Sequence, residues 1–143
     1  MAAIDQAMVS KVLNALLPTG AAGVPGTMIT ALGAGAMKAK LTSTVSTAAA
    51  SGTELTGTGY TAGGTALSAA STASSAGSAV TFPATTALSW TNSSGGAWSI
   101  ASLELTDSAA LRVWFAPFTG QPVAVANGNT FQIAVNACSA SLT

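Results

Sequence analysis

The sequence contains no histidine and only one cysteine. Without histidine, a Ser-His-Asp or Cys-His catalytic arrangement, a histidine-ligated zinc ion and a histidine pH switch are all excluded. The single cysteine, Cys138, cannot form an intrachain disulfide. Its place in an alternating segment favours a small apolar residue on one face of a sheet over a reactive thiol.

Charged residues are also scarce: four Lys or Arg and four Asp or Glu make up 6% of 143 residues, whereas an ordinary soluble domain has about 25%. A free monomer with so few surface charges tends to associate. Disorder is disfavoured because 49% of the residues are apolar. Length and composition therefore predict one compact domain with an arm, which functions inside a fixed assembly.

Long apolar runs are absent as well. No stretch of about 18 uncharged apolar residues occurs, which is the length a membrane-spanning helix needs. Asp5 precedes the first apolar run, where a signal peptide has Lys or Arg. The chain is therefore expected to be neither membrane-spanning nor conventionally secreted.

Residues 1–41 predict a helix followed by two strands. Apolar residues at helical spacing between Ala3 and Leu17 predict a short amphipathic helix. Its apolar stripe packs either on its own domain, which is the favoured interpretation, or on a partner chain. Alternation then predicts strands over 28–32 and 37–41. The side chains of Lys38 and Lys40 share a face of the second strand, and a solvated face is favoured over contact with an acidic neighbour.

Residues 42–79 are almost entirely Ser, Thr, Ala and Gly, and therefore offer little to bury. A structureless segment of this length is uncommon within a compact domain. An extended low-complexity arm is expected, ordered by lying on another subunit.

Residues 80–143 show strand and turn patterns throughout. Short alternating segments recur at roughly ten-residue spacing with Gly, Pro and Asn between them. The expected features are the following: strands at 80–82, 88–90, 98–105, 111–116 and 123–125; a hairpin turn at Asn127-Gly128-Asn129; and a last strand with Phe131, Ile133, Val135 and Ala137 facing inward. The overall prediction is a mostly β fold, a β-sandwich of jelly-roll type, with the N-terminal helix, the arm and the β-rich core forming one domain.

No motif supports catalysis or cofactor binding. The segment 57–62 has the outline of a dinucleotide-binding turn, but it lacks the leading strand and following helix that such a turn requires. Glu104 is expected on a strand face and Asp107 in the turn after it, where an Asp commonly caps. Asn92-Ser93-Ser94 is interpreted as a turn. No catalytic, cofactor or metal site is predicted.

The large side chains are interpreted as packing anchors. A net charge of zero provides no basic surface for nucleic acid, so the tryptophans are core or subunit-interface residues rather than base-stacking ones. The interface candidates are Leu55, Tyr60, Trp90, Trp98 and Trp114.

The order of these features resembles a family of small tailed-phage virion proteins, labelled phage tail fibre, minor tail or minor capsid proteins. The resemblance covers nearly the whole chain. It is carried by the N-terminal helix, Gly52–Tyr60, Val80–Ala84, the tryptophan strand, Leu103–Asp107 with Leu111–Phe115, Val123–Ala126 and Gly128–Phe131. The family usually has Gly after the Asp that corresponds to Asp107, whereas this chain has Ser108-Ala109-Ala110.

The resemblance implies a virion structural protein and no enzyme. The leading interpretation is a capsid decoration or minor capsid protein that is assembled in the host cytoplasm. As a homo-oligomer, expected to be a trimer, it would bind the major capsid protein or other virion proteins and stabilise the shell. The alternative is a tail-associated fibre or minor tail protein that contacts the host surface. Tryptophans placed in strands rather than at loop tips favour the capsid over the tail. No cofactor, nucleic acid or membrane partner is implied.

Overall fold

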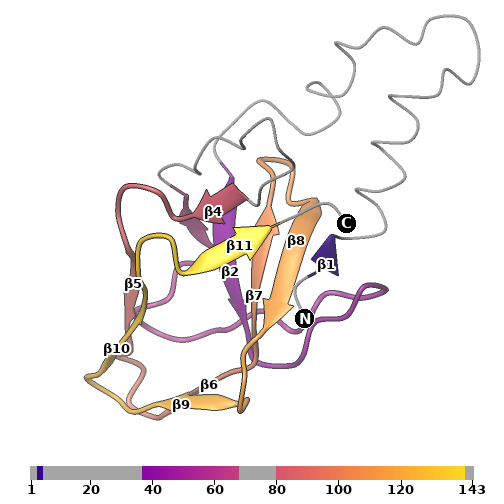
Figure 1. Cartoon of the computed structure of the whole chain (residues 1–143). Coiled ribbons are helices and arrows are strands. Elements are labelled where there is room, and N and C mark those ends of the chain that lie inside the picture. Colours follow the sequence, from indigo (N-terminus) through magenta and orange to yellow (C-terminus); the bar gives the residue numbers. More distant parts are fainter. Residues whose placement is uncertain (1–2, 5–36, 68–79, 141–143) are drawn as a thin grey trace, which may run out of the picture.

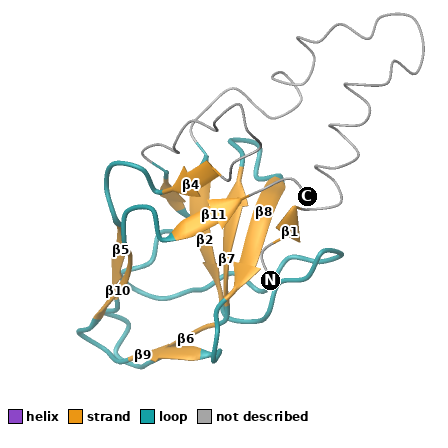
Figure 2. Ribbon diagram, in the orientation of Figure 1, coloured by secondary structure: helices purple, strands orange, loops and turns teal. Residues whose placement is uncertain are grey.

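The computed structural model describes residues 3–4, 37–67 and 80–140, which form strands, turns and loops (Figure 2). The prediction of a mostly β fold is therefore confirmed. The strands are β1 (Ala3–Ile4), β2 (Lys38–Thr42), β3 (Thr65–Ala66), β4 (Val80–Phe82), β5 (Leu88–Thr91), β6 (Trp98–Ile100), β7 (Ser102–Thr106), β8 (Arg112–Pro117), β9 (Val123–Val125), β10 (Thr130–Ile133) and β11 (Cys138–Ala140). The described part of the chain has no helix long and apolar enough to cross a membrane.

Five strands form an antiparallel sheet in the order β1-β8-β7-β2-β3. Register and alternation give this sheet two different faces, because residues opposite one another share a face. Leu105 lies opposite both Ala39 and Trp114, which makes one face apolar. Glu104 lies opposite Lys40 and shares the other, polar face.

A β-bulge changes the polar face where β7 meets β8. Leu105 lies opposite Trp114, but Thr106 lies opposite Arg112, so Val113 is an extra residue in β8. Simple alternation along 111–116 places Arg112 on the same face as Trp114. The bulge moves Arg112 to the face of Glu104 instead.

Three two-stranded antiparallel ribbons, β4–β11, β5–β10 and β6–β9, accompany the sheet (Figure 1). Their inward side chains join the apolar face of the sheet in one core, and the ring of Phe82 in β4 meets that of Trp114 edge-on with centroids 4.8 Å apart. Trp90 and Trp98 are buried in the same core. Alternating burial along β5 and β6 is the pattern expected of strands with one solvated face.

The turn at 127–129 exists, but it does not form the expected hairpin. Asn129 N donates to Ala126 O at 3.0 Å, yet β9 pairs with β6 whereas β10 pairs with β5. The turn therefore connects two ribbons. The expected inward face of the last strand is also wrong beyond β10, since Val135 and Ala137 are exposed in the connection to β11.

The expectation of an extended arm is wrong for residues 42–67. Leu55 N donates to Leu41 O at 2.9 Å, and Leu67 N donates to Met37 O at 2.7 Å. The side chains of Leu55 and Leu67 are both buried. These small residues allow backbones to approach closely: a Cβ at Gly59 would overlap Thr91 O. The remaining arm residues, 68–79, lie outside the described residues.

The expected N-terminal helix does not begin at Ala3, because Ala3 and Ile4 form β1 and pair with β8. The rest of that helix and the expected strand at 28–32 lie outside the described residues.

Candidate functional site

The described residues include six charged side chains, of which only Lys38 is exposed. Lys40 and Glu54 are half-buried, and Asp107 and Arg112 are buried with Glu104. Charge in this part of the chain is therefore mostly internal.

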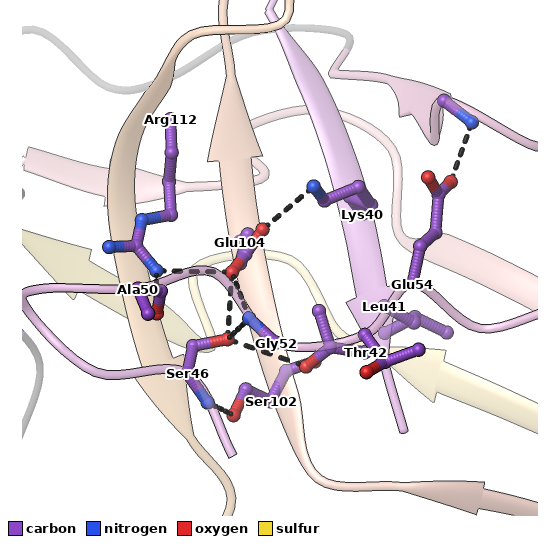
Figure 3. Close-up of polar contacts among 12 residues, drawn as sticks. Lys40, Leu41, Thr42, Ser46, Ala50, Gly52, Glu54, Ser102, Glu104 and Arg112 are labelled. Carbon is purple, nitrogen blue, oxygen red and sulfur yellow. Dashed lines mark hydrogen bonds and ion pairs between the residues drawn. The ribbon is translucent and has the colours of Figure 1, made fainter. Parts of the chain in front are cut away.

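Glu104 lies at the centre of a buried ionic cluster on the polar face of the sheet (Figure 3). Its side chain is fully buried, with 0% relative exposure. Lys40 Nζ lies 2.9 Å from Glu104 Oε2, and Arg112 Nη1 lies 3.2 Å from Glu104 Oε1. Cations on the two neighbouring strands, β2 and β8, thus pair with one carboxylate on the central strand, β7.

The loop of residues 43–53, called loop 43–53 below, closes over this carboxylate. Ser46 Oγ and Gly52 N donate to Glu104 Oε1 at 2.8 and 3.1 Å. Ser46 N also donates to Ser102 Oγ at 2.9 Å. A Cβ at Gly52 would overlap Thr44 O, so this close approach requires glycine.

Arg112 holds the far side of the loop. Its Nη1 donates to Ala50 O and its Nη2 to Thr47 O, both at 2.7 Å. Thr47 and Ala50 also exchange backbone hydrogen bonds of 2.9 and 3.3 Å. Loop 43–53 therefore crosses from β7 to β8, fixed at both points by side chains of the sheet.

Burial alone raises the pKa of the Glu104 carboxyl. The hydrogen bond and charge of Lys40, with the hydrogen bonds from Ser46 and Gly52, outweigh burial and leave that pKa below its ordinary value. Glu104 is therefore ionised at neutral pH, and a carboxylate only accepts hydrogen bonds. The arrangement fits an anchor for the loop better than proton transfer.

A second polar cluster holds the segment that follows the loop. Tyr60 Oη accepts a hydrogen bond from Leu41 N at 3.2 Å and donates to Glu54 Oε1 at 3.1 Å. Gly63 N donates to the same carboxylate oxygen at 2.6 Å. Burial, followed by the charge of Glu54, raises the pKa of Tyr60.

Four of the five interface candidates are buried within the chain itself. Leu55, Trp90, Trp98 and Trp114 are at most 5% exposed within one chain, so the core interpretation holds for them. They are buried because the ribbons and residues 42–67 cover the apolar face of the sheet. Tyr60 is half-buried and packs against the same core.

Other predicted positions agree more closely with the structure. Asp107 Oδ1 accepts from Ala109 N at 2.9 Å and from Leu111 N at 2.7 Å, which confirms the turn-capping interpretation. The Cys138 side chain is half-buried against the core, and burial raises the pKa of its thiol. Lys38 is exposed to solvent, as the favoured interpretation of the two lysines predicted. Lys40 instead contacts an acidic residue, Glu104, which was the alternative interpretation.

The ionic cluster was missed because Glu104 was predicted on a strand face without a partner. The available signal was that Lys40, Glu104 and Arg112 all lie in strand segments of a chain with very few charges. Among the described residues, no group of three or more acidic or Cys side chains is arranged to hold a metal ion.

No protein-family model, curated protein or solved structure matches this chain. The ionic cluster is therefore interpreted from its own geometry, which is that of an internal anchor for an exposed loop.

Proposed function

We propose that this protein is a structural subunit of a tailed-phage virion and that, as a decoration or minor capsid protein, it binds and stabilises the capsid shell. The observation that carries this proposal is the distribution of charge. In the described part of the chain one charged side chain is exposed, while Lys40, Glu104 and Arg112 form the ionic cluster.

An uncharged surface suits permanent contact with neighbouring subunits. Burying an exposed charge in an interface carries a large desolvation cost, whereas Ser, Thr and Ala side chains carry a smaller one or none. A lone soluble protein instead benefits from surface charge, which keeps molecules apart. The described residues therefore present the surface expected of a part that functions within an assembly.

The fold supports a fixed building block. The sheet and the three ribbons enclose one core, and this arrangement favours a two-layered β-sandwich of jelly-roll type. The segment 52–60, the most distinctive part of the resemblance, is held by Glu104, Leu41 and the 91–94 turn, because Ser93 N donates to Thr58 O at 3.0 Å. We further propose that the protein forms homo-trimers and contacts the major capsid protein.

Immunogold labelling of intact virions tests the location. Antibodies raised against the purified protein are applied to particles of the phage that encodes the chain, with particles lacking the gene as the control. Gold on the head supports the proposal. Gold on the tail overturns the capsid assignment in favour of the tail-associated alternative, and particles without gold overturn a virion role.

A further inference from the structure

We propose that the tip of loop 43–53 is a preformed contact element through which the protein binds a second copy of itself. Eight residues of this loop are exposed, and none is charged: Thr44, Val45, Thr47, Ala48, Ala49, Ala50, Ser51 and Thr53. Val45 is 47% exposed and is one of two exposed large hydrophobic residues in the described part of the chain. Figure 1 shows the loop, in purple and magenta, extending past the strands of the sheet toward the side of β1.

Fixing loop 43–53 in one conformation has a free-energy cost. The contribution of the loop to the core does not explain why the fold meets this cost. A buried ion pair is weak evidence for stability, because desolvation offsets most of the attraction, and such pairs are retained in some proteins for structural specificity. Here the buried side chains of Glu104 and Arg112 form hydrogen bonds with Ser46, with Gly52 and with the carbonyl oxygens at the loop tip. The side chains at the tip remain in solvent.

A rigid, exposed element binds with less loss of conformational entropy than a mobile one. Loop 43–53 has that property, because both ends of its tip are tied to the sheet through Ser46, Thr47, Ala50 and Gly52. The structure thus maintains the shape of a surface that it does not itself use for packing.

Charge decides which partner fits this surface. An uncharged Ala-rich tip offers no ion pair to a charged partner, and it would leave the charges of such a partner desolvated and unpaired. A second copy has a net charge of zero, and its described surface exposes only Lys38. Two copies therefore meet without like-charge repulsion, and homomeric contact is the commonest form of assembly for soluble oligomers.

Self-association of the full-length protein tests this inference. Sedimentation equilibrium of the wild type is compared with Ala49→Arg, which places a charge at the tip, and Val45→Thr, which keeps shape but adds a hydroxyl. Ala109→Arg is the matched control, because Ala109 is also an exposed loop alanine. We expect the dissociation constant to rise by at least about tenfold for Ala49→Arg and by less for Val45→Thr. Ala109→Arg should match the wild type.

Three results overturn the inference: a wild type that is monomeric at all concentrations, an Ala49→Arg variant that associates like the wild type, or an equal loss of association in Ala109→Arg. Unchanged melting temperatures show that the variants remain folded. The inference rests on the proposed function only in its need for subunit contact, and the two can fail separately. Gold labelling measures location on the virion, whereas sedimentation measures self-association in solution.

Discussion

Arg112 and Phe115 lie on the same face of the sheet, with Arg112 Cζ 4.8 Å from the centroid of the phenyl ring. Residues three apart on a regular strand point to opposite faces. The extra residue at Val113 removes this conflict, since it shifts the register between Thr106 and Arg112. One bulge therefore places Arg112 where it can pair with Glu104 and reach loop 43–53.

Glu104→Gln should destabilise the fold more than a typical surface substitution does. The variant keeps the size of the side chain but leaves Lys40 and Arg112 without their counter-charge, and uncompensated buried charge costs about 3–5 kcal/mol. Urea unfolding at neutral pH measures the change in the free energy of unfolding. Glu54→Gln is the control, because Glu54 is half-buried and has no ion pair among the described residues. Equal losses in the two variants would contradict a special role for Glu104.

Stability should also depend on pH through Glu104. The pKa of Glu104 in the folded protein lies below its ordinary value, since Lys40, Ser46 and Gly52 outweigh the effect of burial. The unfolded chain therefore takes up this proton at a higher pH than the folded protein. The stabilisation is fully present above the ordinary Glu pKa of about 4.3 and is lost as the pH falls through the folded pKa.

The measurement is the free energy of unfolding between neutral and acidic pH. Below about pH 4.3 the wild type should lose stability more steeply than Glu104→Gln, by up to about 1.4 kcal/mol per pH unit. Parallel curves for the two proteins would show that Glu104 takes up its proton equally in the folded and unfolded states.

Alternation of large apolar residues predicted most of the strands between 80 and 125. The single strand expected at 98–105 is wrong, because the chain breaks at Ala101 into β6, which belongs to a ribbon, and β7, which belongs to the sheet. Leu88 and Trp90 face inward and Ser89 faces outward, because period-two patterns reflect burial on one face. Which strand pairs with which was not predictable in the same way. Asn127-Gly128-Asn129 specifies a turn, but the partner of each strand is decided by the core on which both strands pack.

Composition misled the interpretation of residues 42–67. Ser, Thr, Ala and Gly bury little apolar area, so an extended arm ordered by another subunit was expected. These residues are instead ordered by backbone hydrogen bonds and by two carboxylates, Glu54 and Glu104. The ionic cluster around Glu104 was not predicted either, because it depends on one bulge in β8 that no local sequence pattern indicates.

Gly59→Ala tests whether this segment is closely packed. Gly59 has φ +96°, and a Cβ there would overlap Thr91 O. Gly120 is the matched control, with φ +69° and nothing within 4 Å of an added Cβ. Strain alone should cost about 1–2 kcal/mol in Gly120→Ala, and Gly59→Ala should lose at least about 2 kcal/mol more. Similar unfolding free energies for the two variants would mean that Gly59 is not in contact with the 91–94 turn.

Trp98→Ala should destabilise the domain by about 3–5 kcal/mol, since Trp98 is 3% exposed and its removal leaves a cavity. Phe131→Ala should cost less, because Phe131 is only half-buried and contacts Trp90 and Phe118 near the surface. Thermal unfolding ranks the two variants. A larger loss for Phe131→Ala would place the centre of the core in the β5–β10 ribbon instead.

The last prediction concerns the tether between Arg112 and loop 43–53 in the free protein. Elastase cleaves after small residues, and Ala48, Ala49 and Ala50 are exposed. We nevertheless expect slow cleavage there in the wild type, because proteolysis requires local opening and the Arg112 guanidinium holds the carbonyl oxygens of Thr47 and Ala50.

Arg112→Lys keeps the positive charge beside Glu104, but a single ammonium cannot reproduce the planar fork that binds both carbonyl oxygens. Cleavage within 48–50 should accelerate by at least about tenfold, which corresponds to about 1.4 kcal/mol of easier local opening. Mass spectrometry of early fragments identifies the cut sites, and Lys38→Arg is a control at an exposed cation. If the wild type is cut at these alanines as fast as an unfolded peptide, the loop is not held by the sheet in the free protein. Its order would then depend on a neighbouring subunit.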